Sequence, residues 1–147
     1  MSEQQQNERL NEVLVRILRG LLQYTGECWP WSSAANGDEH VAVMRLVDEQ
    51  QEQIRELSEL LNERGALIDF GTYPTEYTDL NYVSLDYMLD ELIREQQALI
   101  ADLKQAITDC ASDPEGQELL TEIEPQAQQH LDTLKELAAA RTADSST

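Results

Sequence analysis

Hydrophobic residues recur at helical spacing in four separate stretches of the chain. In the first stretch they fall four or three positions apart, which places them on one stripe of a helix. This stripe consists of Leu10, Leu14, Ile17, Leu21 and Tyr24. It predicts a first helix over about residues 7–24.

The second stretch alternates steps of three and four without interruption. Its members are His40, Val43, Val47, Gln50, Ile54, Leu57 and Leu61. Asn36 followed by Glu39 has the form of a capping box, so this helix is expected to begin near Asn36 or Asp38. Gly65 is expected to end it, because glycine readily adopts the left-handed conformation that closes a helix.

The third and fourth stretches complete the set of helices. The third consists of Tyr82, Leu85, Leu89, Leu92, Gln96, Leu99, Leu103 and Ala106. The fourth consists of Leu120, Ile123, Ala127, His130, Leu134 and Leu137. Between them, Ser112-Asp113-Pro114-Glu115 is typical of a helix start. Pro125 lies inside the fourth helix and is expected to kink or loosen it.

The connection between the second and third helices, residues 66–78, is too long for an ordinary hairpin loop. It is long enough to cross the bundle from end to end, which would let the third helix run parallel to the second. The chain is therefore expected to be all-α, an antiparallel four-helix bundle with a long crossover between helices 2 and 3. Residues 7–141 form the bundle in this interpretation, and residues 1–6 and 142–147 are disordered ends.

Composition narrows the classes of partner. The 147 residues include 29 acidic and only 10 basic ones, for a formal net charge of −19. Nucleic acid and anionic lipid both attract Lys and Arg, so neither a nucleic-acid nor a membrane partner is expected, whereas a basic protein partner is compatible. The start of the chain lacks the basic-then-apolar order of a signal peptide, which favours a cytoplasmic protein.

Three of the four stripes contain a polar residue near mid-helix, where the pattern requires an apolar one. These residues are Gln50, Gln96 and His130, and Gln53 lies one turn from Gln50. Burying an amide or imidazole without a partner costs about 1–3 kcal/mol, but groups at one level could satisfy one another. We predict that these four side chains share a structural polar layer near the bundle centre.

The order of elements resembles the ferritin-like superfamily, and most closely the bacterial miniferritins that protect DNA during starvation. The miniferritin pattern is His-Trp, a second His twelve residues after the first, Asp-x-x-x-Glu, and a helix-ending Gly. These positions fall on Cys28-Trp29, His40, Arg55, Glu59 and Gly65. The resemblance implies an iron site between two-fold related subunits, made in that family by the two His, the Asp and the Glu.

Two positions depart from the iron-binding pattern. Cys28 replaces the first His and Arg55 replaces the Asp, which leaves His40, Glu59 and Cys28 as a remnant metal site. Arg55 carries a permanent positive charge where a cation would sit, and it is expected to form an ion pair with Glu59, four residues further on.

The centre of the bundle departs in the same way. Di-iron bundles place a Glu on each of two helices and Glu-x-x-His on the other two. This chain instead has Gln50-x-x-Gln53, Gln96 and Ala127-x-x-His130. Amides are poor ligands for iron, and one His cannot hold a metal pair.

These departures favour a non-catalytic ferritin-like subunit that acts through a homo-oligomer, a dimer or larger, or through partner binding. No catalytic residue and no bound cofactor are assigned. Val41 and Met44, which lie off the main stripe, are candidates for a dimer face. Two alternatives stay open: an iron-binding ferroxidase or metal-storage miniferritin that uses His40, Glu59 and Cys28, and an acidic helical adaptor.

Overall fold

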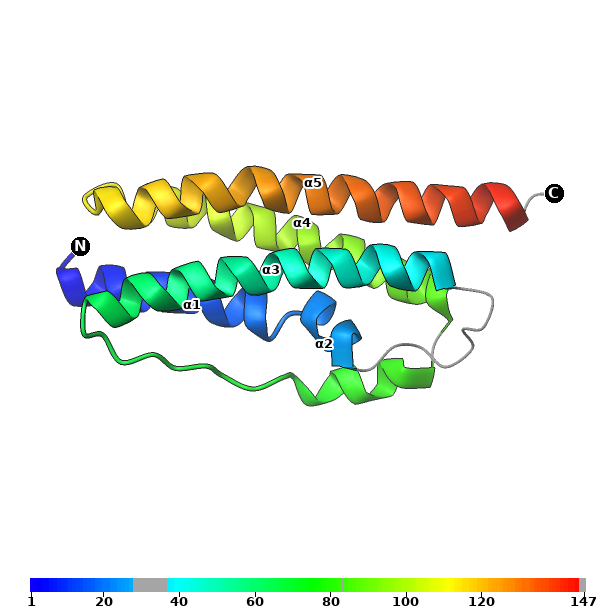
Figure 1. The fold of residues 1–147 in the computed structure, drawn as a ribbon, viewed down its shortest axis with the longest axis horizontal. Coiled ribbons are helices and arrows are strands. Elements are labelled where there is room, and N and C mark those ends of the chain that lie inside the picture. The colour runs from blue at the N-terminus through cyan, green and yellow to red at the C-terminus, as the bar shows by residue number, and fades with distance from the viewer. Residues whose placement is uncertain (28–36, 83, 146–147) are drawn as a thin grey trace.

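The computed structural model of the protein describes residues 1–27, 37–82 and 84–145. In these ranges it contains five α-helices, one 3₁₀ helix and no strands. The elements are α1 (Glu3–Leu18), α2 (Leu21–Glu27), α3 (Gly37–Glu63), η1 (Thr75–Tyr82), α4 (Leu85–Asp109) and α5 (Pro114–Ser145). Figure 1 shows α3, α4 and α5 as long rods beside α1, with α2 following α1. The predicted all-α four-helix bundle is confirmed.

The direction of the rods follows the expected crossover. The colours of Figure 1 show α3 and α4 running one way and α1 and α5 the other, while the segment between α3 and α4 returns along the whole length of the bundle. This crossover contains η1. Tyr82, taken from the sequence as the first member of the third stripe, belongs to η1 and not to α4.

The first helix begins earlier than predicted. Ser2 caps α1: its hydroxyl accepts a hydrogen bond from the Gln5 backbone N–H, and the Gln5 side chain accepts one from the Ser2 N–H. This reciprocal box satisfies two backbone donors that a helix start leaves unpaired. The structure places residues 3–6 in this helix, where the sequence led us to expect a disordered start.

The first rod breaks between α1 and α2, which the continuous stripe did not predict. A Cβ atom at Gly20 would stand 2.8 Å from the carbonyl oxygen of Arg16, so the turn there requires glycine. The Glu95 carboxylate accepts a hydrogen bond from the Leu21 N–H at 3.2 Å and so pairs a donor that the break exposes. In Figure 1, α2 follows α1 toward the right-hand end of the bundle.

The second predicted helix ends as expected, at Gly65. Its φ of 69° lies in the left-handed region, Gly65 N–H donates to Asn62 O, and Ala66 N–H donates to Leu61 O. These two bonds form a Schellman motif. The expected cap at Asn36 lies outside the described residues.

The predicted stripes form the core, which divides into two apolar blocks. One block includes Leu14, Leu57, Leu103 and Leu120. The other includes Leu21, Val47, Leu89 and Leu134. Along α3, α4 and α5 the change from one block to the other falls at the polar positions Gln50 and Gln53, Gln96 and His130. A polar level thus lies between two apolar ones.

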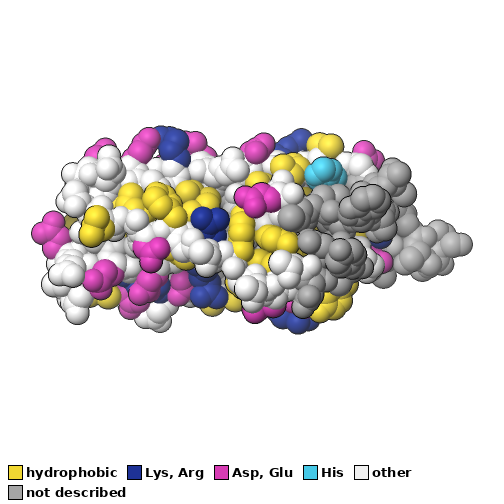
Figure 2. All heavy atoms as spheres, turned by 90° about the horizontal axis from the view of Figure 1, so that it is seen from below, with side chains coloured by type: hydrophobic (Ala, Val, Ile, Leu, Met, Phe, Trp, Pro, Cys, Tyr) yellow, Lys and Arg dark blue, Asp and Glu magenta, His cyan; other side chains and the backbone are white. Residues whose placement is uncertain are grey.

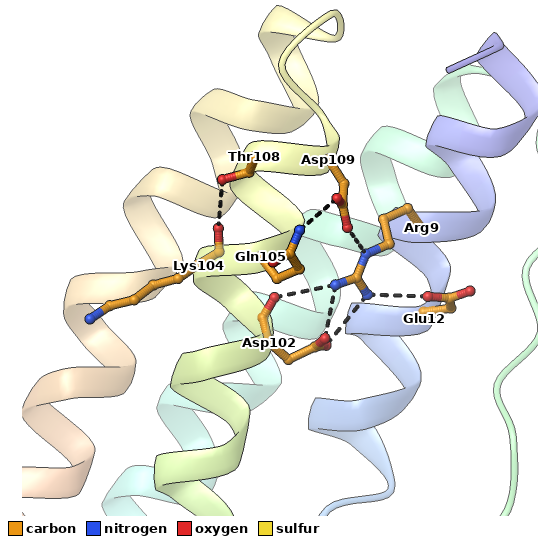
Figure 3. Close-up of polar contacts among 7 residues, drawn as sticks. All are labelled: Arg9, Glu12, Asp102, Lys104, Gln105, Thr108 and Asp109. Atoms are coloured by element: carbon orange, nitrogen blue, oxygen red, sulfur yellow. Dashed lines mark hydrogen bonds and ion pairs between the residues drawn. The ribbon is translucent and has the colours of Figure 1, made fainter.

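Arginines tie the helices together at one end of the bundle. Arg9 on α1 is held by Asp102 and Asp109 of α4 at 2.8 and 3.0 Å, as Figure 3 shows. Arg64, just after α3, makes a bidentate pair with Asp113 at 2.7 and 2.8 Å. Asp113 also accepts the Gly116 N–H and so caps the start of α5.

The last helix is longer and less disturbed than expected. α5 begins at Pro114, as predicted, and runs without interruption through Pro125 to Ser145. The structure places residues 142–145 of the expected disordered tail in this helix, while 146–147 lie outside the described residues. No described helix combines the length and apolar character needed to cross a membrane.

Candidate functional site

Five buried polar side chains mark the middle of the bundle, and we call this level the waist. Their exposed fractions are between 1% and 5%. They are Gln23, Gln50, Gln53, Gln96 and His130. The last four are the members predicted from the sequence, whereas Gln23 of α2 was not expected.

Gln23 joins the first rod to α3. Its side-chain amide donates to the backbone carbonyl of Val47 at 2.9 Å and to Oε1 of Gln50 at 3.0 Å. Both side chains are buried, and buried polar groups need hydrogen-bond partners. Each amide is a partner for the other. The pair fixes the register of α2 against α3.

The other two glutamines bond to α5. Gln53 donates to Oε1 of Gln126 at 2.9 Å, and Gln96 donates to the backbone carbonyl of Ala127 at 3.0 Å. The waist therefore joins each of α3 and α4 to α5 by one amide. Each predicted glutamine bonds to a neighbour outside the set taken from the sequence, so they share a region of the core rather than one closed ring.

His130 reaches from the core to the surface. It is 1% exposed, and its Nε2 lies 2.7 Å from Oε2 of Glu49, whose side chain is 51% exposed. Its other ring nitrogen, Nδ1, is buried without a hydrogen-bond partner among the described residues. The ring thus links α5 to α3 through one nitrogen only.

Glu95 is the carboxylate on α4 that lies next to the waist. Besides the Leu21 N–H it accepts a hydrogen bond from the Tyr77 hydroxyl at 2.7 Å. Burial raises the pKa of Glu95, although these two bonds act in the opposite direction. Burial and the bond to Glu95 likewise raise the pKa of Tyr77. Glu95 therefore holds α2, η1 and α4 together.

A comparison with known protein families shows which family the chain belongs to. The model of the ferritin-like domain matches residues 7–141, nearly the whole chain. The chain belongs to the ferritin-like family. A comparison with curated proteins finds no match.

The waist of this ferritin-like chain does not have the donors of a di-iron centre. Such centres in ferritin-like bundles use four Glu and two His, whereas here the buried groups are four neutral amides and one imidazole. Two carboxylates beside the waist already have partners: Glu49 bonds to His130, and Glu95 bonds to Tyr77 and to the Leu21 N–H. Over the described ranges, no group of three or more His, Cys, Asp or Glu is placed to hold a metal ion.

The remnant site expected from the miniferritin pattern is spread along α3. His40 and Glu59 lie 19 positions apart on one helix, which at 1.5 Å per residue separates them by about 28 Å. Arg55 pairs with Glu59, and also with Glu52. Cys28 lies outside the described residues. Within one chain, His40 and Glu59 cannot share an ion.

Several partners in the waist could not be found from the sequence. Glu49 and Gln126 lie on exposed helix positions, where a polar residue is ordinary. Gln23 was missed because the first stripe was extended through Gly20 as though the helix were unbroken. The one available signal was Gly20 itself, since an internal glycine weakens a helix.

Proposed function

We propose that this protein is a ferritin-like bundle subunit whose di-iron site is degenerate, and that it acts through oligomer assembly or partner binding. One observation carries the proposal: amides and an imidazole that bond to protein groups occupy the waist. Gln96, for example, presents a neutral amide whose NH₂ group donates to the backbone carbonyl of Ala127, and a neutral amide is a poor ligand for iron. The waist then serves to fix the register of the helices.

Iron chemistry is the alternative that the experiment must exclude. We would purify the protein without chelators, measure bound iron and zinc by elemental analysis, and add Fe²⁺ under air while following absorbance from ferric species. We expect no stoichiometric metal and no oxidation above the rate of buffer alone. Two metal ions per chain, or rapid oxidation that Gln50→Leu abolishes, would overturn the proposal.

A His40→Ala variant tests the remnant site separately. If His40 and Glu59 of two chains held iron, this variant would lose metal and the Gln50→Leu variant would not. We expect the same background uptake for both variants and the wild type. A selective loss in His40→Ala would instead support the metal-storage alternative.

The acidic adaptor remains a second candidate because of one surface feature. A groove of about 320 Å³ between α3 and α5 is lined by two leucines and six glutamates. These are Leu60, Leu119, Glu56, Glu59, Glu63, Glu115, Glu118 and Glu122. A chain that stays monomeric at all concentrations would favour the adaptor over an assembling subunit.

A further inference from the structure

A small cavity lies at the waist, between the buried amides and the break that separates α1 from α2. It measures about 20 Å³, and Gln50, Glu95 and Gln96 line it from α3 and α4. Arg16 and Gly20 line it from the end of α1 and the break that follows. The cavity therefore brings together polar side chains of two long helices in the middle of the bundle.

Two of the amides beside this cavity use only one of their two polar atoms within the protein. Gln50 accepts a hydrogen bond from Gln23 through Oε1, and Gln96 donates one to the Ala127 carbonyl through Nε2. Gln23 also donates to the Val47 carbonyl, and carbonyls only accept, so the orientation of each amide is fixed. Among the described residues, Nε2 of Gln50 and Oε1 of Gln96 have no hydrogen-bond partner.

These two atoms are in a buried place but are not sealed in by protein. Gln50 and Gln96 are 2% and 3% exposed. Over the described ranges, the one fully enclosed side-chain nitrogen or oxygen without a partner is Nδ1 of His130. The remaining atoms of Gln50 and Gln96 therefore still reach open space, and the cavity is a space that both residues line. Buried polar groups need a partner, so this space calls for one.

The polar groups of the walls select the occupant. Gln50 offers an N–H donor, Gln96 a carbonyl oxygen, and Glu95 a carboxylate. Glu95 accepts bonds from Tyr77 and Leu21 and has lone pairs left for another. A metal ion cannot accept the Gln50 N–H, and an anion cannot donate to Gln96 and would meet the carboxylate. Water can do both.

The size of the cavity agrees with this choice. A buried water needs roughly 10–15 Å³ and typically makes about three hydrogen bonds. The cavity offers about 20 Å³ and three polar groups. In Figure 1, α2 and the crossover lie on the lower side of the bundle, and Figure 2 views that side. Figure 2 shows hydrophobic side chains along its middle with both acidic and basic ones beside them, so this face does not concentrate ions of one sign.

We propose that the waist binds one water molecule, which accepts a hydrogen bond from Nε2 of Gln50 and donates to Oε1 of Gln96 and to the Glu95 carboxylate. The water joins α3 to α4, which none of the three waist glutamines on these helices does directly: Gln50 bonds to α2, and Gln53 and Gln96 bond to α5. The inference rests on the proposed function, because it requires a waist without iron, and it names the ligand of that waist.

A high-resolution crystal structure of the full chain, grown with iron or zinc, is the first test. We expect a peak about 2.7–3.2 Å from both Nε2 of Gln50 and Oε1 of Gln96, without anomalous scattering. A waist with no peak between these atoms would overturn the inference and leave the proposed function standing. An anomalous peak there, with ligands at about 2.0–2.2 Å, would overturn both.

The second test counts long-lived internal waters in solution by magnetic relaxation dispersion of the water oxygen. Gln96→Met removes the acceptor with a side chain of similar length, and we expect the count to fall by one water per chain. Gln53→Met is the matched control, because Gln53 is an equally buried waist amide that does not line the cavity. It should keep the wild-type count.

Each variant is first checked for helical circular dichroism, and Gln50→Met, which removes the donor, replaces Gln96→Met if that chain does not fold. An unchanged count in a folded Gln96→Met or Gln50→Met chain would overturn the inference. So would an equal loss in Gln53→Met, which would show that any change of a waist amide disturbs internal water. The crystal structure of the wild-type chain tests the inference without any variant.

Discussion

A buried amide stabilises the waist only while its partner is present, and Gln23 with Gln50 shows this most directly. In Gln50→Leu, the Gln23 amide keeps its bond to the Val47 carbonyl but loses the one to Gln50. We expect the free energy of unfolding to fall by about 1–3 kcal/mol, the cost of leaving one buried N–H of that amide unpaired. Urea denaturation of the purified variant measures it.

The double variant Gln23→Leu with Gln50→Leu separates the hydrogen bond from the packing. Replacing both partners removes the unpaired group, so the loss should be smaller than the sum of the two single losses by at least about 0.5 kcal/mol. Strictly additive losses would mean that the two amides are not coupled. In that case the waist would owe its stability to packing alone.

Glu95 should give an unusual dependence of stability on pH. Its pKa is raised in the folded chain, chiefly by burial. The folded state therefore binds the proton of Glu95 more tightly than the unfolded state does. The stabilisation contributed by the protonated group is then present at low pH and is lost as the pH rises through the folded pKa. We expect Glu95→Gln to lose less stability than wild type as the pH rises from the ordinary pKa of a glutamate through the raised pKa of Glu95. Parallel stability curves for the two proteins would contradict this.

The end of α3 depends on one backbone conformation. No atom lies within 4 Å of a Cβ placed on Gly65, so Gly65→Ala creates no clash and tests only its φ of 69°. A left-handed alanine costs about 1–2 kcal/mol, which we expect to see as lost unfolding free energy in urea. Gly37→Ala is the control, because Gly37 also has open space around it but no positive φ. It should change stability by less than about 0.5 kcal/mol.

The elements show what local pattern can and cannot predict. The stripes located the helices and Gly65 the end of one of them, because apolar periodicity and a glycine cap act within a few residues. The break after α1 could not be predicted in that way. Gly20 was its only local sign, and the Glu95 carboxylate that pairs the exposed Leu21 N–H comes from another helix, 74 positions along the chain. The burial of Gln50, Gln96 and His130 was predictable for the same reason as the stripes, but their partners were not.

The molecule as a whole carries many more acidic than basic residues, so most of its negative charge has no positive partner. With 29 acidic against 10 basic residues, repulsion among carboxylates should outweigh the ion pairs of Arg9 and Arg64, so salt should stabilise the fold. Raising NaCl from about 0.01 to about 0.15 M shortens the screening length from about 30 to about 8 Å. We expect a gain on the order of 1 kcal/mol, or roughly 2–4 °C in Tm, by calorimetry.

Divalent cations then distinguish general screening from a metal site. If the waist binds no metal, MgCl₂ and FeSO₄ (the latter without oxygen) should raise Tm no more than NaCl of equal ionic strength, and without saturation. A specific site would instead add RT ln(1 + [L]/Kd) and would show itself far below millimolar concentration. An iron-dependent rise at a few micromolar would therefore contradict the degenerate waist even in a chain that oxidises nothing.

A Tm that falls with NaCl would show that the ion pairs between helices, and not the excess of carboxylates, dominate the electrostatics of this fold.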